Sequence, residues 1–272
     1  MSYKTIIEPR SLSLTKKLKE LYQYRELLHT LTYRDYRVRY AQTFIGFTWA
    51  IVNPLLTVVL LTFVFGTVAK VDTGNIPHGL YTIAGMCGWN YFASIVGQAG
   101  NSIIGSQNMV KKIYFPRLIL PLSKAITALI DFLVVVICLT LMMWYCGVWP
   151  SGNLIYFPLF TLAVIISGLT GGIWVSCLSI RYRDFQHIVP FLLRLGMFVT
   201  PIAFPISAVP EQYKLLFYLN PLVGIVEGFR WSILGVGTLE SYIWVSFGVT
   251  FILFIGGLFY FNKVEQVMAD IL

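Results

Sequence analysis

The first pattern along the chain is a stripe of leucines with helical spacing. It consists of Leu14, Leu18, Leu21, Leu27, Leu28 and Leu31. Steps of three, four and seven place these side chains on one helix face, and charged residues such as Lys16, Lys19 and Arg25 lie on the other. The pattern predicts an amphipathic interface helix in the lipid headgroup layer, with its leucines toward the bilayer. The alternative is a soluble helix that packs this stripe on a globular core.

Six apolar segments follow, and polar turns separate them. The first contains no ionisable side chain, and about 20 apolar residues are enough to cross the hydrocarbon core of a bilayer. The predicted spans cover residues 44–69, 80–98, 118–145, 154–180, 187–204 and 242–261. We therefore predict an all-α polytopic membrane protein with six transmembrane helices.

Residues 207–237 are apolar but differ from the six spans. They contain Glu211 and Lys214, and Asn220-Pro221 interrupts the pattern. Proline lacks the N–H that a helix interior needs, and the residue before a proline avoids the helical conformation. We predict two short re-entrant helices that enter from the periplasmic side before the last span. Glu227 and Arg230 are one turn apart and should pair at this outer mouth.

Composition supports a membrane protein. Of the 272 residues, 57% are hydrophobic and 12% are charged, and the mean hydropathy is +0.74. Soluble domains carry about 25% charged residues. The predicted organisation is a cytoplasmic N-terminus with the interface helix at 1–43, a six-span transmembrane domain at 44–261, and a cytoplasmic tail at 262–272.

The formal net charge of +8 is concentrated beside the predicted spans. Nine of the twenty Lys and Arg residues precede residue 40. With six spans and the N-terminus inside, fifteen fall in cytoplasmic segments and three fall outside. This asymmetry predicts that both termini are cytoplasmic. It also favours contact with anionic membrane lipid over nucleic acid.

The sequence lacks motifs for catalysis. It has no GxxxxGK[ST] phosphate loop, no acid pair and no nucleophile beside a base. Its four cysteines form no CxxC pair and its three histidines are far apart, so no metal site is expected. We expect a chain that is not an enzyme and has no cofactor of its own.

Three ionisable residues fall inside predicted spans and are candidates for function. Lys124 is expected to snorkel to the inner surface, and Asp131 to face the protein interior in a structural role. Arg194 could contact an anionic group in transit or snorkel to inner headgroups. Aromatic residues, 16% of the chain, could form interfacial belts or line a conduit in which their faces stack on sugar rings.

Five blocks occur in a distinctive order and spacing. They are Arg34-Asp35-Tyr36-Arg37-Val38-Arg39-Tyr40 followed by Gly46, Trp49 and Asn53-Pro54; Lys111-Lys112-Ile113-Tyr114-Phe115-Pro116-Arg117-Leu118-Ile119-Leu120-Pro121; Arg183-Asp184 followed by Pro201-Ile202; Asn220-Pro221 with Glu227 and Arg230; and Tyr260-Phe261, Glu265 and Ala269-Asp270-Ile271. The chain resembles the membrane subunit of ABC-2-type polysaccharide exporters, most closely the O-antigen branch, over essentially its whole length. The second block is the most specific.

This resemblance implies a homodimeric permease in the bacterial inner membrane, driven by two copies of a separate ATPase subunit that binds ATP and Mg. The implied substrate is an undecaprenyl-linked O-antigen polysaccharide that moves from cytoplasm to periplasm. Permeases for capsular polysaccharide and teichoic acid share the pattern and stay open as alternatives.

The resemblance also guides the choice of three sets of site residues. Those for ATPase coupling are Arg34, Arg37, Arg39, Lys111, Lys112, Arg117, Arg181, Arg183 and Asp184. Those that line the channel are Phe47, Trp49, Phe63, Phe65, Phe191 and Phe198, with Arg194 as the channel charge. Those of a periplasmic gate are Glu211, Tyr213, Tyr218, Asn220, Pro221, Glu227 and Arg230.

Two other classes of function stay open at this point. A membrane enzyme acting on a lipid-linked sugar would need carboxylates or histidines clustered at one membrane edge, and none is evident in the sequence. A secondary transporter or channel would be expected to carry paired intramembrane charges or two halves with matching helix breaks. Only one broken segment is obvious.

Overall fold

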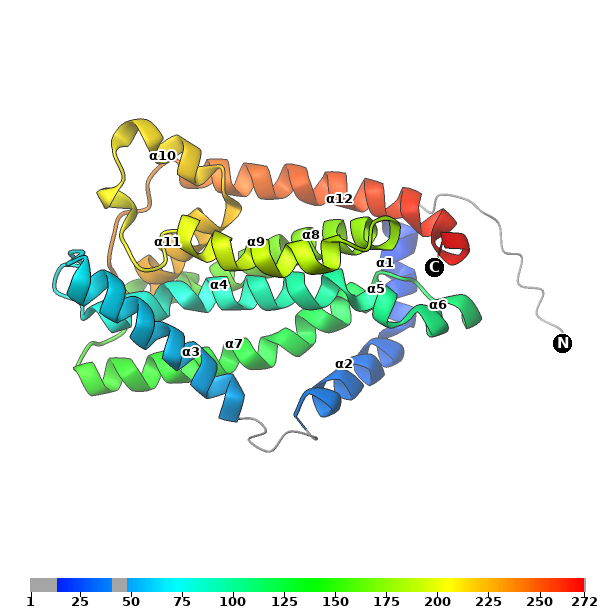
Figure 1. Ribbon diagram of the computed structural model, residues 1–272, viewed down its shortest axis with the longest axis horizontal. Coiled ribbons are helices and arrows are strands. Elements are labelled where there is room, and N and C mark those ends of the chain that lie inside the picture. The colour runs from blue at the N-terminus through cyan, green and yellow to red at the C-terminus, as the bar shows by residue number, and fades with distance from the viewer. Residues whose placement is uncertain (1–13, 41–47, 272) are drawn as a thin grey trace, which may run out of the picture.

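The computed structural model describes residues 14–40 and 48–271. Within these ranges it contains twelve α-helices, three short segments of other helix types and no strand. The long helices run side by side in an elongated bundle (Figure 1). The predicted all-α class is confirmed.

Four helical segments are long and apolar enough to cross a membrane. They are Thr48–Val68 (α3, Thr48–Leu61, and the π-helical η1, Thr62–Val68), Ile119–Cys146 (α7), Gly152–Arg181 (η2, Gly152–Tyr156, and α8, Phe157–Arg181) and Ile243–Met268 of α12 (Ile243–Ile271). These segments match predicted spans one, three, four and six. The last helix continues past residue 261, where the cytoplasmic tail was predicted to begin.

The second and fifth predicted spans are helices of a different character. α4 (His78–Gly100) has 23 residues, enough for about 34 Å, but it is mostly buried within the protein. α9 (Phe185–Val199) has 15 residues and spans about 22 Å, less than a typical hydrocarbon core. It ends at Val199, before the predicted limit at 204, because Pro201 cannot continue the helix.

α4 lies at the centre of the bundle and packs against α7, α8 and α11 (Pro221–Leu234). Glycines permit the closest approach. A Cβ added at Gly172 of α8 would lie 2.6 Å from the Cβ of Ala99, and one at Gly168 would lie 2.8 Å from Ile95. The small-residue spacing in α8 therefore serves helix packing.

The predicted break at Asn220-Pro221 is confirmed. α10 (Glu211–Tyr218) and α11 are separate short helices, and η3 (Ile206–Ala208) precedes them. Asn220 caps α11 by accepting a hydrogen bond from the Leu222 N–H at 3.0 Å, and Pro221 occupies the first turn. α11 ends at Gly235, whose φ of 68° is left-handed.

The interface segment forms two helices, α1 (Leu14–Gln23) and α2 (Arg25–Tyr40). Its leucines were predicted to point toward the bilayer, and in the structure they pack on protein. Leu21, Leu27, Leu28 and the buried Leu31 pack on a second apolar core made by α5 (Ser102–Gly105), α6 (Gln107–Lys112), α7, α8 and α12. The protein covers Leu31 and partly covers the other three, so these leucines do not all face the bilayer; the position of the segment in the headgroup layer stays a prediction. The side chains of Leu14 and Leu18 lie outside the described part.

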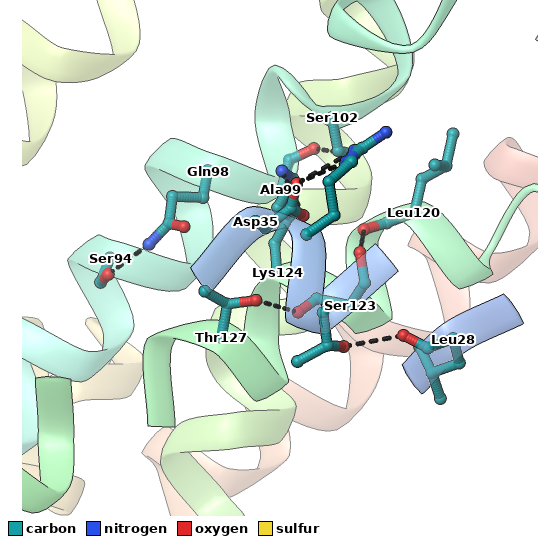
Figure 2. A network of polar contacts seen from close by, with 12 residues as sticks. Leu28, Asp35, Ser94, Gln98, Ala99, Ser102, Leu120, Ser123, Lys124 and Thr127 are labelled. Atoms are coloured by element: carbon teal, nitrogen blue, oxygen red, sulfur yellow. Dashed lines mark hydrogen bonds and ion pairs between the residues drawn. The ribbon is translucent and has the colours of Figure 1, made fainter. Parts of the chain in front are cut away.

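Two ion pairs also fasten α2 to α7. The Lys124 ammonium lies 2.6 Å from the Asp35 carboxylate, and the Arg39 guanidinium lies 2.5 Å from Asp131. Figure 2 shows Asp35 and Lys124 joined between the two helices. The expected snorkelling of Lys124 is wrong, because a carboxylate on α2 meets its ammonium. The pairing of Asp131 agrees with the structural role that we predicted for it.

We predict that Lys124→Ala lowers the melting temperature of the purified protein. The side chains of Lys124 and Asp35 are only 19% and 11% exposed. Loss of such a pair should cost about 1–3 kcal/mol, between the values for exposed and buried pairs. Thermal unfolding followed by tryptophan fluorescence would measure this. Arg34→Ala is the control, because Arg34 also contacts Asp35 but is half exposed; equal effects of the two changes would contradict the prediction.

Candidate functional site

Most of the predicted channel aromatics lie on exposed faces of spans one and five. Trp49, Phe63, Phe191 and Phe198 are each at least half exposed. Phe65 instead turns toward Phe204, with 6.3 Å between ring centroids. Leu61, Phe65, Met197 and Phe198 line one small cavity, so the far ends of these two helical segments meet. Phe47 lies outside the described residues.

Arg194 shares the exposed face of α9 with two of these aromatics. It follows Phe191 by three residues and precedes Phe198 by four, and all three side chains are exposed. Arg194 makes no ion pair with a described residue. Its predicted contact with an anionic group stays a prediction.

The predicted coupling residues lie mostly at one end of the bundle. α5, α6, α1 and the C-terminal part of α12 gather there (Figure 1). Lys111, Lys112, Arg181, Arg183 and Asp184 are exposed. Arg34 pairs with Asp35, and the Arg37 guanidinium lies 5.9 Å from the Tyr33 ring centroid.

Two of these residues are engaged within the protein. Arg39 binds Asp131 of α7, as described above. Arg117 donates to the backbone carbonyl of Glu265 in α12, and its N–H donates to the Glu265 carboxylate at 3.3 Å. The exposed cations on α6 and at the end of α8, together with the exposed Arg34 and Arg37 of α2, are therefore accessible to a partner. None of the coupling roles is tested by these contacts.

Glu227 and Arg230 pair as predicted, with 2.8 Å between the guanidinium and the carboxylate. They do not lie at an open mouth, however. Arg230 is completely buried, and it also donates to the backbone carbonyls of Tyr81 and Ile202. Its guanidinium carbon lies 3.9 Å from the centroid of the Tyr81 ring. The pair thus joins α11, α4 and the loop after α9 in the protein core.

The other predicted gate residues are divided between surface and core. Tyr213 is exposed, and Tyr218 is buried. Exposed Glu211 contacts Lys214 at 2.8 Å, and Lys214 also contacts Glu240 at 2.7 Å. Hydrogen bonds to Glu211 and then to Glu240 raise the pKa of Lys214, so its ammonium is charged at neutral pH and loses its proton only in strong base. Asn220 reaches Thr200 as well as capping α11.

Sequence reasoning missed a polar cavity of about 430 Å³ between α3, α4 and α7. Its lining includes Arg39, Trp49, Asn53, Asn90, Ser94 and Asp131. The signal was available in the pairs Asn53/Thr57 and Asn90/Ser94, each spaced by four residues within an apolar helix.

The model of the ABC-2 type transporter family matches residues 26–234, from α2 through α11. The chain belongs to this family. It is therefore a membrane protein of a transporter family, as its four long apolar helices also indicate.

Named proteins are similar to this ABC-2 chain over most of its length. An O-antigen export system permease protein RfbA from Myxococcus xanthus is 32% identical over 78% of this chain and 82% of the relative. An RfbA from Klebsiella pneumoniae is 29% identical over 91% of this chain and 95% of the relative. The polysialic acid transport protein KpsM from Escherichia coli is 24% identical over 89% and 95%.

For this ABC-2 chain we predict that exchanging the two residues of the buried Glu227–Arg230 pair does not preserve stability. Exchanging Glu227 and Arg230 would place a carboxylate against the carbonyl oxygens of Tyr81 and Ile202. The exchanged protein should therefore be no more stable than Arg230→Met, which should itself cost about 3–5 kcal/mol by leaving Glu227 unpaired in the core. Adding Glu227→Gln to Arg230→Met should recover part of this loss. A thermal-unfolding series would measure these effects, and recovery of the wild-type melting temperature by the exchange would contradict the geometry.

Proposed function

We propose that this chain is the membrane subunit of an ATP-driven exporter that moves lipid-linked O-antigen polysaccharide from cytoplasm to periplasm. The observation that carries the proposal is the family match over residues 26–234. The names of the RfbA relatives supply the substrate class. The relative named for polysialic acid transport is less similar, so export of capsular polysaccharide is the second candidate and teichoic acid follows it.

The proposed topology has six spans, with α4 and α9 as the second and fifth. α9 is short for a full crossing, and a thinner local bilayer or neighbouring protein would accommodate it. The protein would lie in the inner membrane with both termini on the cytoplasmic side. That side would be the end of the bundle that carries the exposed Lys111, Lys112, Arg181 and Arg183. α10 and α11 would then lie at the periplasmic side.

The active unit would be a homodimer whose two copies form the channel. Exposed apolar and aromatic side chains on α3 and α9 support this arrangement, because two copies could enclose a path between these faces. Arg194 would present a positive charge to that path.

ATP and Mg would be bound by two copies of a separate ATPase subunit beneath the basic end. Closure of the ATPase dimer would move α1, α2, α6 and the 181–184 turn. The chain itself would carry out no catalysis. Within its described residues, no three His, Cys, Asp or Glu side chains are grouped to hold a metal ion.

The proposed function predicts transport that depends on ATP and on the partner. In cells that lack this chain, surface O-antigen should be lost and lipid-linked polymer should accumulate inside. Re-expression should restore export only when the ATPase is present. Export in inverted vesicles should continue when an ionophore collapses the proton gradient and ATP is maintained. Export without the ATPase would overturn the proposal. So would loss of export when the proton gradient is collapsed and ATP is maintained.

The coupling role predicts a second outcome. Arg183→Gln combined with Asp184→Asn should reduce polymer-stimulated ATP turnover several-fold, because both exposed groups would contact the ATPase. Dimer size and melting temperature should be unchanged. Lys70→Gln with Asp72→Asn, a cation and an acid in the turn between η1 and α4, is the matched control. Equal turnover in both double variants would remove Arg183 and Asp184 from the coupling surface.

A further inference from the structure

The cavity between α3, α4 and α7 presents side-chain amides that form no hydrogen bond within the described part of the chain. Asn53 comes from α3 and Asn90 from α4, and neither amide forms a hydrogen bond with another described residue. Polar groups within apolar helices are costly and usually find partners. Each amide has two donor hydrogens and one acceptor oxygen. The two amides are therefore available to a ligand that both donates and accepts hydrogen bonds.

Neighbouring groups extend this mixed donor and acceptor lining. The Ser94 hydroxyl accepts from the Gln98 amide at 2.7 Å, so its own proton is available (Figure 2). The Tyr91 hydroxyl donates to the Ala125 carbonyl at 3.2 Å and keeps acceptor capacity. Pro54 has no N–H for the carbonyl of Ala50, which also borders the cavity.

The charges at the cavity compensate each other. Arg39 and Asp131 lie 2.5 Å apart and are the charged residues in its described lining. A diphosphate or other anion that approached Arg39 would also meet the Asp131 carboxylate and would have to displace it. A neutral ligand with hydroxyl groups would instead find a donor in the guanidinium and an acceptor in the carboxylate.

The cavity also offers an apolar surface of suitable size. Trp49 is 52% exposed, so about half of its side-chain surface is accessible, and the buried Phe132 and Val135 form part of the wall. The C–H faces of a sugar ring are apolar and can pack on an indole face, while its hydroxyls reach polar groups at the edges. A volume of about 430 Å³ lies within the range of small-ligand sites.

We propose that this cavity binds an uncharged, hydroxyl-rich sugar unit of the transported glycolipid, stacked on Trp49 and hydrogen-bonded by Asn53 and Asn90. The inference rests on the proposed export function and adds to Trp49, on the exposed face of α3, a defined sugar subsite that includes Asn53 and Asn90. The cavity recognises the sugar end of the substrate, and its balanced charge disfavours the phosphate-bearing junction with the lipid.

Photo-crosslinking in cells tests the proposal directly. Trp49 is replaced with p-benzoylphenylalanine in full-length chain co-expressed with its ATPase, in cells that make the polymer. Irradiation should shift the chain to the high and heterogeneous mass of a polysaccharide adduct. The adduct should survive mild acid, which cleaves the phosphate link between lipid carrier and sugar. Trp144, exposed at the far end of α7 and outside this cavity, is the matched control position.

Each outcome has a defined meaning. A polymer adduct at position 49, absent at 144 and stable to mild acid, supports the subsite. An adduct that loses its polymer in acid, or one with phospholipid alone, overturns it because the lipid occupies the cavity. A third crosslinker position, Phe198, lies on the exposed face of α9. Polymer adducts there with none at position 49 would overturn the subsite and leave the export function standing. Loss of export dependence on the ATPase would instead overturn the function.

A double variant provides an independent measure. Asn53→Leu with Asn90→Leu keeps side-chain bulk and removes the amides, and it should lower polymer crosslinking at position 49 about tenfold because two neutral hydrogen bonds are lost. Asn153→Leu, in η2 and outside the cavity, should leave crosslinking unchanged. Co-purification with the ATPase checks that each variant assembles. Undiminished crosslinking in an assembled double variant would overturn the role of the amides.

Discussion

The buried guanidinium of Arg230 is the contact on which the arrangement of this bundle depends most. A charge removed from water must be compensated, and here Glu227, two backbone carbonyls and the face of Tyr81 share that task. These partners belong to α11, α4 and the loop after α9. One side chain therefore fixes three elements that are far apart in the sequence. The absence of a side chain at Gly85 leaves room for it, since a Cβ there would lie 2.6 Å from the guanidinium.

The same constraint explains how the interface segment is attached. α2 carries a mixture of charges, and its Asp35 and Arg39 meet groups of opposite sign on α7. Leucines on the same segment cover a separate apolar core. α2 is thus a part of the folded bundle, so a force applied to it would move α7 directly. Arg194 is the contrasting case, because it is exposed on α9 and forms no ion pair with a described residue. Because a charge facing lipid is costly, the exposed face of α9 should contact water, a second copy of the chain or a substrate.

Local features of the fold followed from the sequence, and long-range contacts did not. The break at Asn220-Pro221 was predictable because proline acts through its own backbone. The Glu227–Arg230 pair was predictable because residues three apart are neighbours on one face of a helix. Its burial was not, because that depends on Tyr81 and Ile202, which lie 149 and 28 residues away from Arg230. Lys124 was misassigned for the same reason, since its partner is 89 residues distant. Hydropathy alone also could not distinguish a lipid-facing helix from α4, which the protein surrounds.

Motion at the basic end of the bundle would be transmitted through the elements that ion pairs and close packing join together. The helices with exposed surfaces would be less constrained. Arg117 ties the start of α7 to the end of α12, and the α2 pairs tie the interface segment to α7. Glycines hold α4 and α8 in close contact. Elements joined in this way should move as one body, because separating them would leave buried charges unpaired or expose packed apolar surfaces. α3 and α9 carry much of the exposed apolar surface and have fewer contacts of this kind. A push at the basic end should therefore shift the core as a unit and change the spacing between these two helices and whatever lies against them.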